Sequence, residues 1–149
     1  MTRLISILTI LLLTSCSSNY DKREVTKYLK DVKELNQILI SQKESLKWKN
    51  DLMTISTTIP QTRRLMKLLE NKLNLTEIEF HDNIDREQNH FGLAYRFGNP
   101  STDKKYSFLI FSQDDLESFR YYEQFSDCGE SEILEGNWAF SKITVDCNN

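Results

Sequence analysis

Two histidines have the side-chain chemistry of metal ligands. His81 and His90 are the only histidines of the chain, and Asp85 lies between them. If the flanking Phe80 and Phe91 face a core from paired strands, both histidines point outward beside one loop. Zn²⁺ accepts imidazole nitrogen and carboxylate oxygen as ligands. A polar hairpin loop also contains such residues without binding metal. The sequence therefore predicts no cofactor and leaves His81, His90 and Asp85 as candidate ligands only.

Other groupings of polar residues have simpler explanations than catalysis. Asp114 and Asp115 suit the first turn of a helix, where acidic side chains are favourable. Glu77 and Glu79 suit the solvated face of a strand. No serine-hydrolase elbow, zinc-protease helix motif or phosphate-binding loop occurs in the chain. We therefore assign no catalytic residue and expect the protein not to be an enzyme.

An aromatic group follows these acids, with Arg120 between Phe119 and the pair Tyr121 and Tyr122. Tyrosine and arginine are typical anchors of protein interfaces. Packing against a sheet is the competing explanation, and it suits phenylalanine best. Arg120, Tyr121 and Tyr122 are therefore candidates for contact with a partner.

The chain opens with Arg3 and an apolar run from Leu4 to Leu13. A helix that crosses a bilayer needs about 20 apolar residues, so this shorter run is typical of a secretory signal peptide. The run ends in Leu13-Thr14-Ser15-Cys16, which resembles the lipobox of bacterial lipoproteins: an aliphatic residue, two small residues and an obligatory cysteine. The resemblance covers residues 1–16, and no domain family is recognised in the remainder.

The resemblance implies that Cys16 receives a diacylglycerol on sulfur, that the signal peptide 1–15 is removed, and that the new amino terminus is acylated, for instance by palmitate. Two or more acyl chains give stable attachment to a bilayer. Residues 16–21 would form a lipidated tether, and Ser17 resembles an outer-membrane signal. The expected location is the bacterial cell envelope, at the outer membrane, facing the periplasm or the cell surface. An ordinary signal peptide that contains a cysteine is the alternative.

The other two cysteines, Cys128 and Cys147, form an even pair once Cys16 is lipidated. Such a pair in an exported protein predicts a disulfide. The bridge would close a loop of about 20 residues and stabilise the fold by roughly 3 kcal/mol. Two separate thiols, or a bridge to another chain, are the alternatives.

The charge balance limits the partners. Residues 1–15 carry one charge, Arg3, so the remaining chain has 18 basic and 22 acidic side chains and a net charge of −4. Nucleic-acid binding normally needs a basic footprint, so we expect no nucleic-acid partner. Attraction to anionic lipid is also weak, and the acyl groups would have to hold the protein on the membrane.

The helical patterns come first in the domain. Val25, Val32, Leu39, Leu46 and Met53 recur every seven residues, which predicts one long helix over about residues 22–50. Pro60 suits a first helical turn. A second helix over about 60–73 places leucines along one side and has Asn74 as its terminator; these leucines are Leu65, Leu68, Leu69 and Leu73. The two helices most simply form an antiparallel hairpin.

From residue 75 the apolar period changes to two, which predicts half-buried antiparallel strands up to about residue 147. One predicted strand carries Phe91, Leu93, Tyr95 and Phe97 on a single face, and the next strand carries Tyr106, Phe108 and Ile110 on a single face. A short helix before the last hairpin is expected over about 113–124, although a strand there is the alternative. In the last strand, Trp138 and Phe140 alternate with Ala139, Ser141 and Ile143.

Taken together, these patterns predict an α+β fold: a signal peptide (1–15), a tether (16–21) and a single domain (22–149) in which a helical hairpin packs on an antiparallel sheet of four or five strands. The expected function is that of a membrane-anchored, non-enzymatic binding or accessory module that contacts the lipid bilayer through Cys16 and an envelope protein through its domain. The alternatives are an immunity or inhibitor protein against an envelope-acting toxin or enzyme, and a metal-dependent hydrolase that uses the His81–His90 loop.

Overall fold

The computed structural model describes residues 21–42, 60–85, 88–99, 101–103, 105–113 and 129–144, and within 80–85 and 88–91 it describes the backbone alone. Several predictions lie outside these residues: the signal peptide, Cys16, the Cys128–Cys147 bridge, the short helix over 113–124 and the partner candidates Arg120, Tyr121 and Tyr122.

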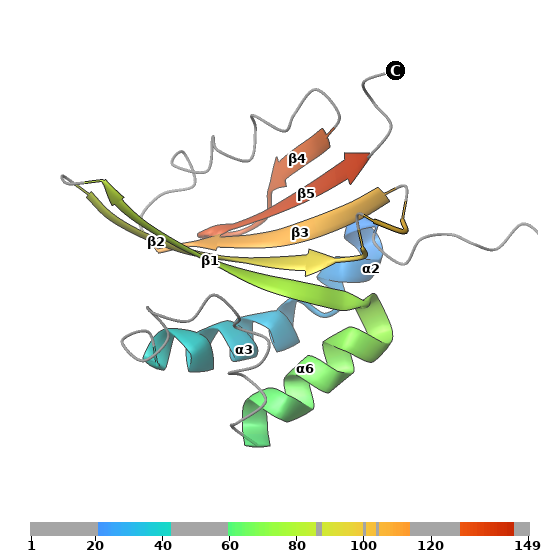
Figure 1. Ribbon diagram of the computed structural model, residues 1–149, viewed down its shortest axis with the longest axis horizontal. Helices are drawn as coiled ribbons and strands as arrows, with labels where there is room; N and C mark the ends of the chain where they lie inside the picture. The colour runs from blue at the N-terminus through green and yellow to red at the C-terminus, as the bar shows by residue number, and fades with distance from the viewer. Residues whose placement is uncertain are drawn as a thin grey trace, which may run out of the picture.

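Five strands form one open antiparallel sheet in the order β1-β2-β3-β5-β4. The α+β class and the number of strands are thereby confirmed. Figure 1 shows α3 and α6 on the same face of this sheet. The described elements are α2 (Lys22–Thr26), α3 (Leu29–Ser41), α6 (Pro60–Leu73), β1 (Leu75–Asp85), β2 (Gln88–Phe97), β3 (Lys105–Ser112), β4 (Gly129–Ile133) and β5 (Trp138–Thr144).

The first predicted helix is divided in two. Lys27 and Tyr28 form a turn between α2 and α3, in which the backbone N–H of Tyr28 donates to the carbonyl of Val25 at 3.1 Å. Val25 before the break and Val32 after it are both fully buried in the core. Helix α3 ends at Ser41, and Leu46 and Met53 of the predicted repeat lie outside the described residues.

Helix α6 spans Pro60–Leu73 and stops at an asparagine in the left-handed conformation. Asn74 has φ 51°, and its carbonyl accepts a hydrogen bond from the N–H of Gly98 at 2.9 Å. Asparagine tolerates this conformation better than other side chains do. The helix therefore ends where the sequence predicts, and β1 begins directly afterwards. On its inner side Met66 is buried, whereas Leu68 is only half-buried.

The helices cover one face of the sheet, which we call the helix face. Leu93, Tyr95 and Phe97 of β2 are fully buried there, as the alternation of that strand predicts. The same core includes Trp138 and Phe140 of β5, together with apolar side chains of all three described helices. Burial of apolar area from water at about 25 cal/mol per Å² is the main force holding these layers together.

Strand β3 is buried on both faces, which differs from the half-buried strand that its alternation predicts. Leu109 belongs to the core under the helices, while Phe108 and Ile110 form a second cluster on the opposite face. We call this face the helix-free face, because none of the three described helices lies on it. Ala94 of β2 and Ile143 of β5 complete this cluster. Strand β3 pairs with β2 on one side and with β5 on the other, so it lies at the centre of the sheet. Its side chains on each face therefore have side chains of both neighbouring strands beside them.

The core contains one polar pair at its centre. Tyr95 is fully buried, and its hydroxyl donates a hydrogen bond of 2.9 Å to the side-chain oxygen of Asn36 on α3. Burial raises the pKa of the Tyr95 phenol well above its usual value, so the hydroxyl keeps its proton. The ring of Tyr95 also stacks on Trp138, with 6.1 Å between centroids. This pair joins α3 to two strands.

We expect Tyr95→Phe to lower the free energy of unfolding by about 1–3 kcal/mol, because it leaves the Asn36 oxygen buried without a donor. Urea-induced unfolding measures this difference. The double variant Tyr95→Phe/Asn36→Leu should recover much of the loss, since both polar partners are then replaced by apolar groups of similar shape. Tyr106→Phe, at a half-buried tyrosine on the other face, is the matched control and should change stability by less than about 0.5 kcal/mol. A double variant that is less stable than Tyr95→Phe would contradict this account.

Candidate functional site

The helix-free face of β1 and β2 carries a run of polar residues. Side chains alternate between the two faces of a strand, and Ala94, in the cluster on the helix-free face, identifies which positions of β2 belong there. The register then assigns the same face to alternate positions of β1. We call this set the β1–β2 polar stripe: Glu77, Glu79, His81, Asn83, Asp85, Gln88, His90 and Arg96.

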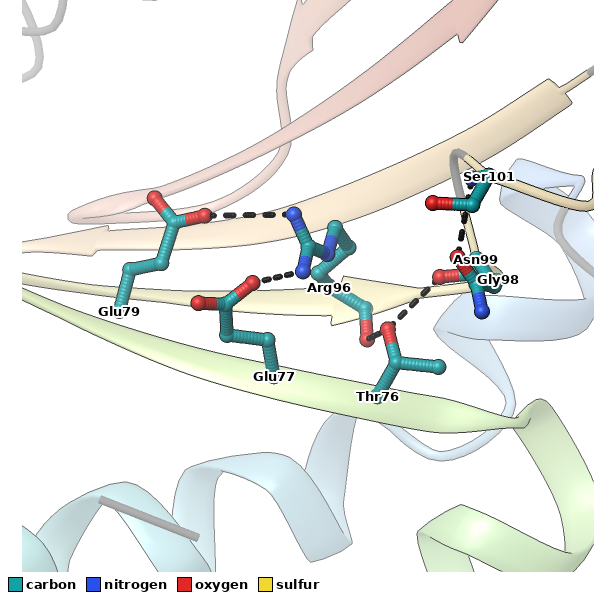
Figure 2. Close-up of polar contacts among 7 residues, drawn as sticks. All are labelled: Thr76, Glu77, Glu79, Arg96, Gly98, Asn99 and Ser101. Atoms are coloured by element: carbon teal, nitrogen blue, oxygen red, sulfur yellow. Dashed lines mark hydrogen bonds and ion pairs between the residues drawn. The ribbon is translucent and has the colours of Figure 1, made fainter. Parts of the chain in front are cut away.

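A β-bulge at Thr76 decides which residues enter the stripe. The register shifts between Leu75 and Glu77, so Thr76 is the extra residue of β1. Its hydroxyl donates to the carbonyl of Gly98 at 2.7 Å, which holds the bulge against the end of β2 (Figure 2). Without the extra residue, Leu75 and Ile78 would face opposite sides. With it both are buried under the helices, and Glu77 lies opposite Arg96 on the helix-free face.

Arg96 forms the centre of the charged part of the stripe. Its guanidinium makes an ion pair with Glu77 and a longer one with Glu79, at 3.9 Å (Figure 2). The three side chains are 23%, 41% and 28% exposed, respectively. Pairs of this exposure contribute at most about 1 kcal/mol each, so they set the arrangement of the charges more than they stabilise the fold. Two carboxylates against one guanidinium leave this group with one net negative charge.

The guanidinium is incompletely satisfied by the described residues. The Nε atom of Arg96 is buried, and among the described residues it has no hydrogen-bond partner. A buried donor without an acceptor costs about 1–3 kcal/mol, which offsets part of the gain from the two ion pairs. Arg96 was not among the residues predicted as functional. The sequence pattern that could have identified Arg96 is its position on the polar face of one predicted strand, next to a strand whose polar face carries two glutamates.

The stripe borders the apolar cluster on the same face. In the register Arg96 pairs with Phe108, and Ala94 pairs with Ile110. Tyr106 packs edge-on against Phe108, with 5.6 Å between ring centroids. The helix-free face is therefore charged over β1 and β2 and apolar over the central strands. Because Ala94, Phe108 and Ile110 are buried, the charged side chains of β1 and β2 are the part of this face that another macromolecule could contact.

The candidate metal ligands lie on the stripe at its hairpin end. His90 pairs with Asn83, so His81 and Asp85 are its two diagonal neighbours. Diagonal positions of an antiparallel pair are roughly 7–8 Å apart. His81 and Asp85, however, are separated by four residues of extended strand, or about 13 Å. With bond lengths of about 2 Å, we therefore expect an ion to bind His90 together with one of these neighbours at a time.

Away from the side chains of residues 80–91, the described residues include no group of three histidine, cysteine or acidic side chains that could hold a metal ion. None of the described helices is long and apolar enough to cross a bilayer. Among the described side chains, Ile133 at the end of β4 is the one large apolar group that is mostly exposed, at 66%. A single exposed apolar residue is common on protein surfaces.

Comparison with known proteins finds no relative of this chain. No family model, curated protein or solved structure matches this chain. The function of this chain must therefore be inferred from its own residues and their geometry.

The geometry of the hairpin predicts how any Zn²⁺ binding would respond to substitution. A rise in melting temperature produced by Zn²⁺ should vanish in His90→Ala and in only one of His81→Ala and Asp85→Asn, because the ion can bridge His90 to one neighbour at a time. Thermal unfolding with and without Zn²⁺ measures the effect, with Asp31→Asn on α3 as the control. Loss of the rise in all three hairpin variants would show that the register does not limit the ligand set.

Proposed function

We propose that this chain is a lipid-anchored, non-enzymatic binding module of the bacterial cell envelope. The observation that carries the proposal is the apolar run ending in Leu13-Thr14-Ser15-Cys16, which is followed within a few residues by a folded domain. Acyl groups on Cys16 would hold the mature chain on a bilayer. Ser17 supports the outer membrane, with the domain facing the periplasm or the cell surface.

The start of the domain supports attachment by a short tether. Asp21 accepts a hydrogen bond from Lys142 of β5, and Lys22 makes an ion pair with Glu132 of β4 at 2.5 Å. Val25, four residues after Asp21, is buried in the core. The chain is therefore tied to the sheet from Asp21 onward, and only residues 17–20 would separate the domain from a lipidated Cys16.

The β1–β2 polar stripe supports the binding role. Its ion pairs between Arg96, Glu77 and Glu79 are partly exposed, and they lie beside the apolar cluster of the central strands. We propose that an envelope protein binds this face and that the acidic excess of the stripe favours a basic patch on that partner. The aromatic candidates Tyr121 and Tyr122, with Arg120, remain part of the proposal.

Finer features of the fold belong to the same proposal. Helices α3 and α6 would form an antiparallel hairpin, which is supported by the ion pair between Arg64 and Glu34 at 3.4 Å and by the core that both helices share. A short helix would occupy about 113–124. A Cys128–Cys147 disulfide is supported by the pairing of Gly129 with Ile143, because Cys128 directly precedes Gly129 in the sequence and Cys147 follows Ile143 by four residues.

We expect Cys16→Ala to move the protein from the membrane fraction to the soluble fraction, because the acyl groups are the proposed attachment. Fractionation and the intact mass of the extracted protein measure this. The mass should correspond to a chain that begins at Cys16 with added lipid, and it should increase by two hydrogens on reduction of the disulfide. Cys147→Ser is the matched control and should stay in the membrane fraction. An unmodified mass for the membrane-extracted chain would reject the anchor.

A photo-crosslinking residue at position 79 should capture a specific envelope protein in cells, whereas the same residue at Lys67, on the exposed side of α6, should not. Glu77→Lys should weaken the capture, because it reverses a charge beside the crosslinker. Mass spectrometry identifies the captured protein. Capture of a toxin or an envelope-acting enzyme would select the immunity or inhibitor version of the function. Equal capture at both positions would reject the stripe as the binding surface.

A further inference from the structure

The register divides the sheet into two opposite ends. At one end β1 and β3 begin, while β2 and β5 finish. At the other end the β1–β2 hairpin extends beyond the neighbouring strands (Figure 1). We call the first the tether end, with Leu75, Phe97, Lys105, Gly129 and Thr144, and the second the hairpin end, with Asp85, Gln88, Ser112, Ile133 and Trp138.

The first described residue, Asp21, is fixed beside the tether end. Its carboxylate accepts a hydrogen bond from Lys142, near the end of β5, and Lys105, the first residue of β3, adds a favourable charge interaction. Both lysines lower the pKa of Asp21 below its usual value, with Lys142 as the larger cause, so the carboxylate stays charged at neutral pH. The attachment point of the tether is therefore held at one end of the sheet.

The number of residues in the tether sets an upper limit on its reach. Five Cα-to-Cα steps join Cys16 to Asp21, and a fully extended chain covers at most about 18 Å in that number of steps. Strand β1 alone, with ten steps at about 3.3 Å, is roughly 33 Å long. The tether is thus about half the length of β1: it keeps Asp21 within about 18 Å of the bilayer, whereas the hairpin end can lie roughly 33 Å farther away.

We propose that the tether end of the sheet faces the bilayer and rests on the phospholipid headgroups, while the hairpin end is presented away from the membrane. This inference depends on the lipid anchor of the proposed function. It adds an orientation: Glu77 and Arg96 lie near the membrane, and Asp85 and His90 lie far from it. The part of the polar stripe that a partner meets first is then its hairpin end.

The surface at the tether end suits headgroups rather than the acyl interior. The turn between β2 and β3 is polar, and Ser101 and Thr102 are exposed there. The carboxylate of Asp103 accepts hydrogen bonds from the backbone N–H of Asn99, at 2.7 Å, and from the Thr102 hydroxyl. Two cations of this region, Arg23 and Lys105, are exposed. Cations close to a bilayer favour anionic headgroups, so these side chains orient a domain that the acyl groups already hold.

The orientation can be tested with the lipidated protein in nanodiscs of phosphatidylethanolamine and phosphatidylglycerol that contain a lipid with a gadolinium-chelating headgroup. The paramagnetic ion broadens amide signals, and the effect falls steeply with distance. We expect strong intensity loss at Ser101 and Thr102 of the tether end and little loss at Gln88 and Asn89 of the hairpin end. Equal loss at both ends, or greater loss at the hairpin, would overturn the proposed orientation.

A variant with a long flexible Gly/Ser insertion between Ser18 and Asn19 is the matched control. Its domain is unchanged, but its tether is longer than the sheet, so the difference in broadening between the two ends should shrink. A difference of the same size in this variant would show that the tether does not set the orientation. The intact mass of the same sample distinguishes the two proposals: a chain without lipid rejects the anchor, whereas a lipidated chain without the gradient rejects only the orientation.

Discussion

The centre of the helix face is a phenol that has been removed from water. Tyr95 can occupy this place because Asn36 supplies the one acceptor that its hydroxyl needs, since a buried donor without a partner is costly. The Tyr95 ring stacks on the Trp138 ring, and the centroid of the Trp138 ring lies 5.3 Å from that of Phe111. The position of α3 along the sheet therefore follows from one hydrogen bond as well as from apolar contact.

Helix α3 and the start of the chain are also placed by apolar burial and by charge pairs at the margin of the sheet. Lys33 of α3 pairs with Glu135 beside β5, and Asp21 pairs with Lys142. Exposed pairs of this kind stabilise a fold only weakly, but they define where the chain enters it. This is why the break at Lys27–Tyr28 matters: it allows the start of the chain to reach β5 while α3 keeps its contact with Tyr95.

The two faces of the sheet have different roles. The helix face is filled by the core, whereas the helix-free face is apolar over β3 and β5 and charged over β1 and β2. The bulge at Thr76 separates these roles within β1, because it buries both Leu75 and Ile78 and leaves Glu77 beside Arg96. A face that carries partly exposed ion pairs, on a domain that the proposed lipid anchor would hold by a short tether, is the physical basis of the proposed binding function.

The sequence by itself determined the α+β class, the alternation of β2 and the stop at Asn74, because these depend on neighbours along the chain. Only the tertiary structure decided that β3 is buried on both faces, that the first helix is divided, and that Met66 rather than Leu68 points into the core. It also decided that Arg96 meets two glutamates. Periodicity shows which side chains share a face, but strand order, register and bulges decide what that face meets.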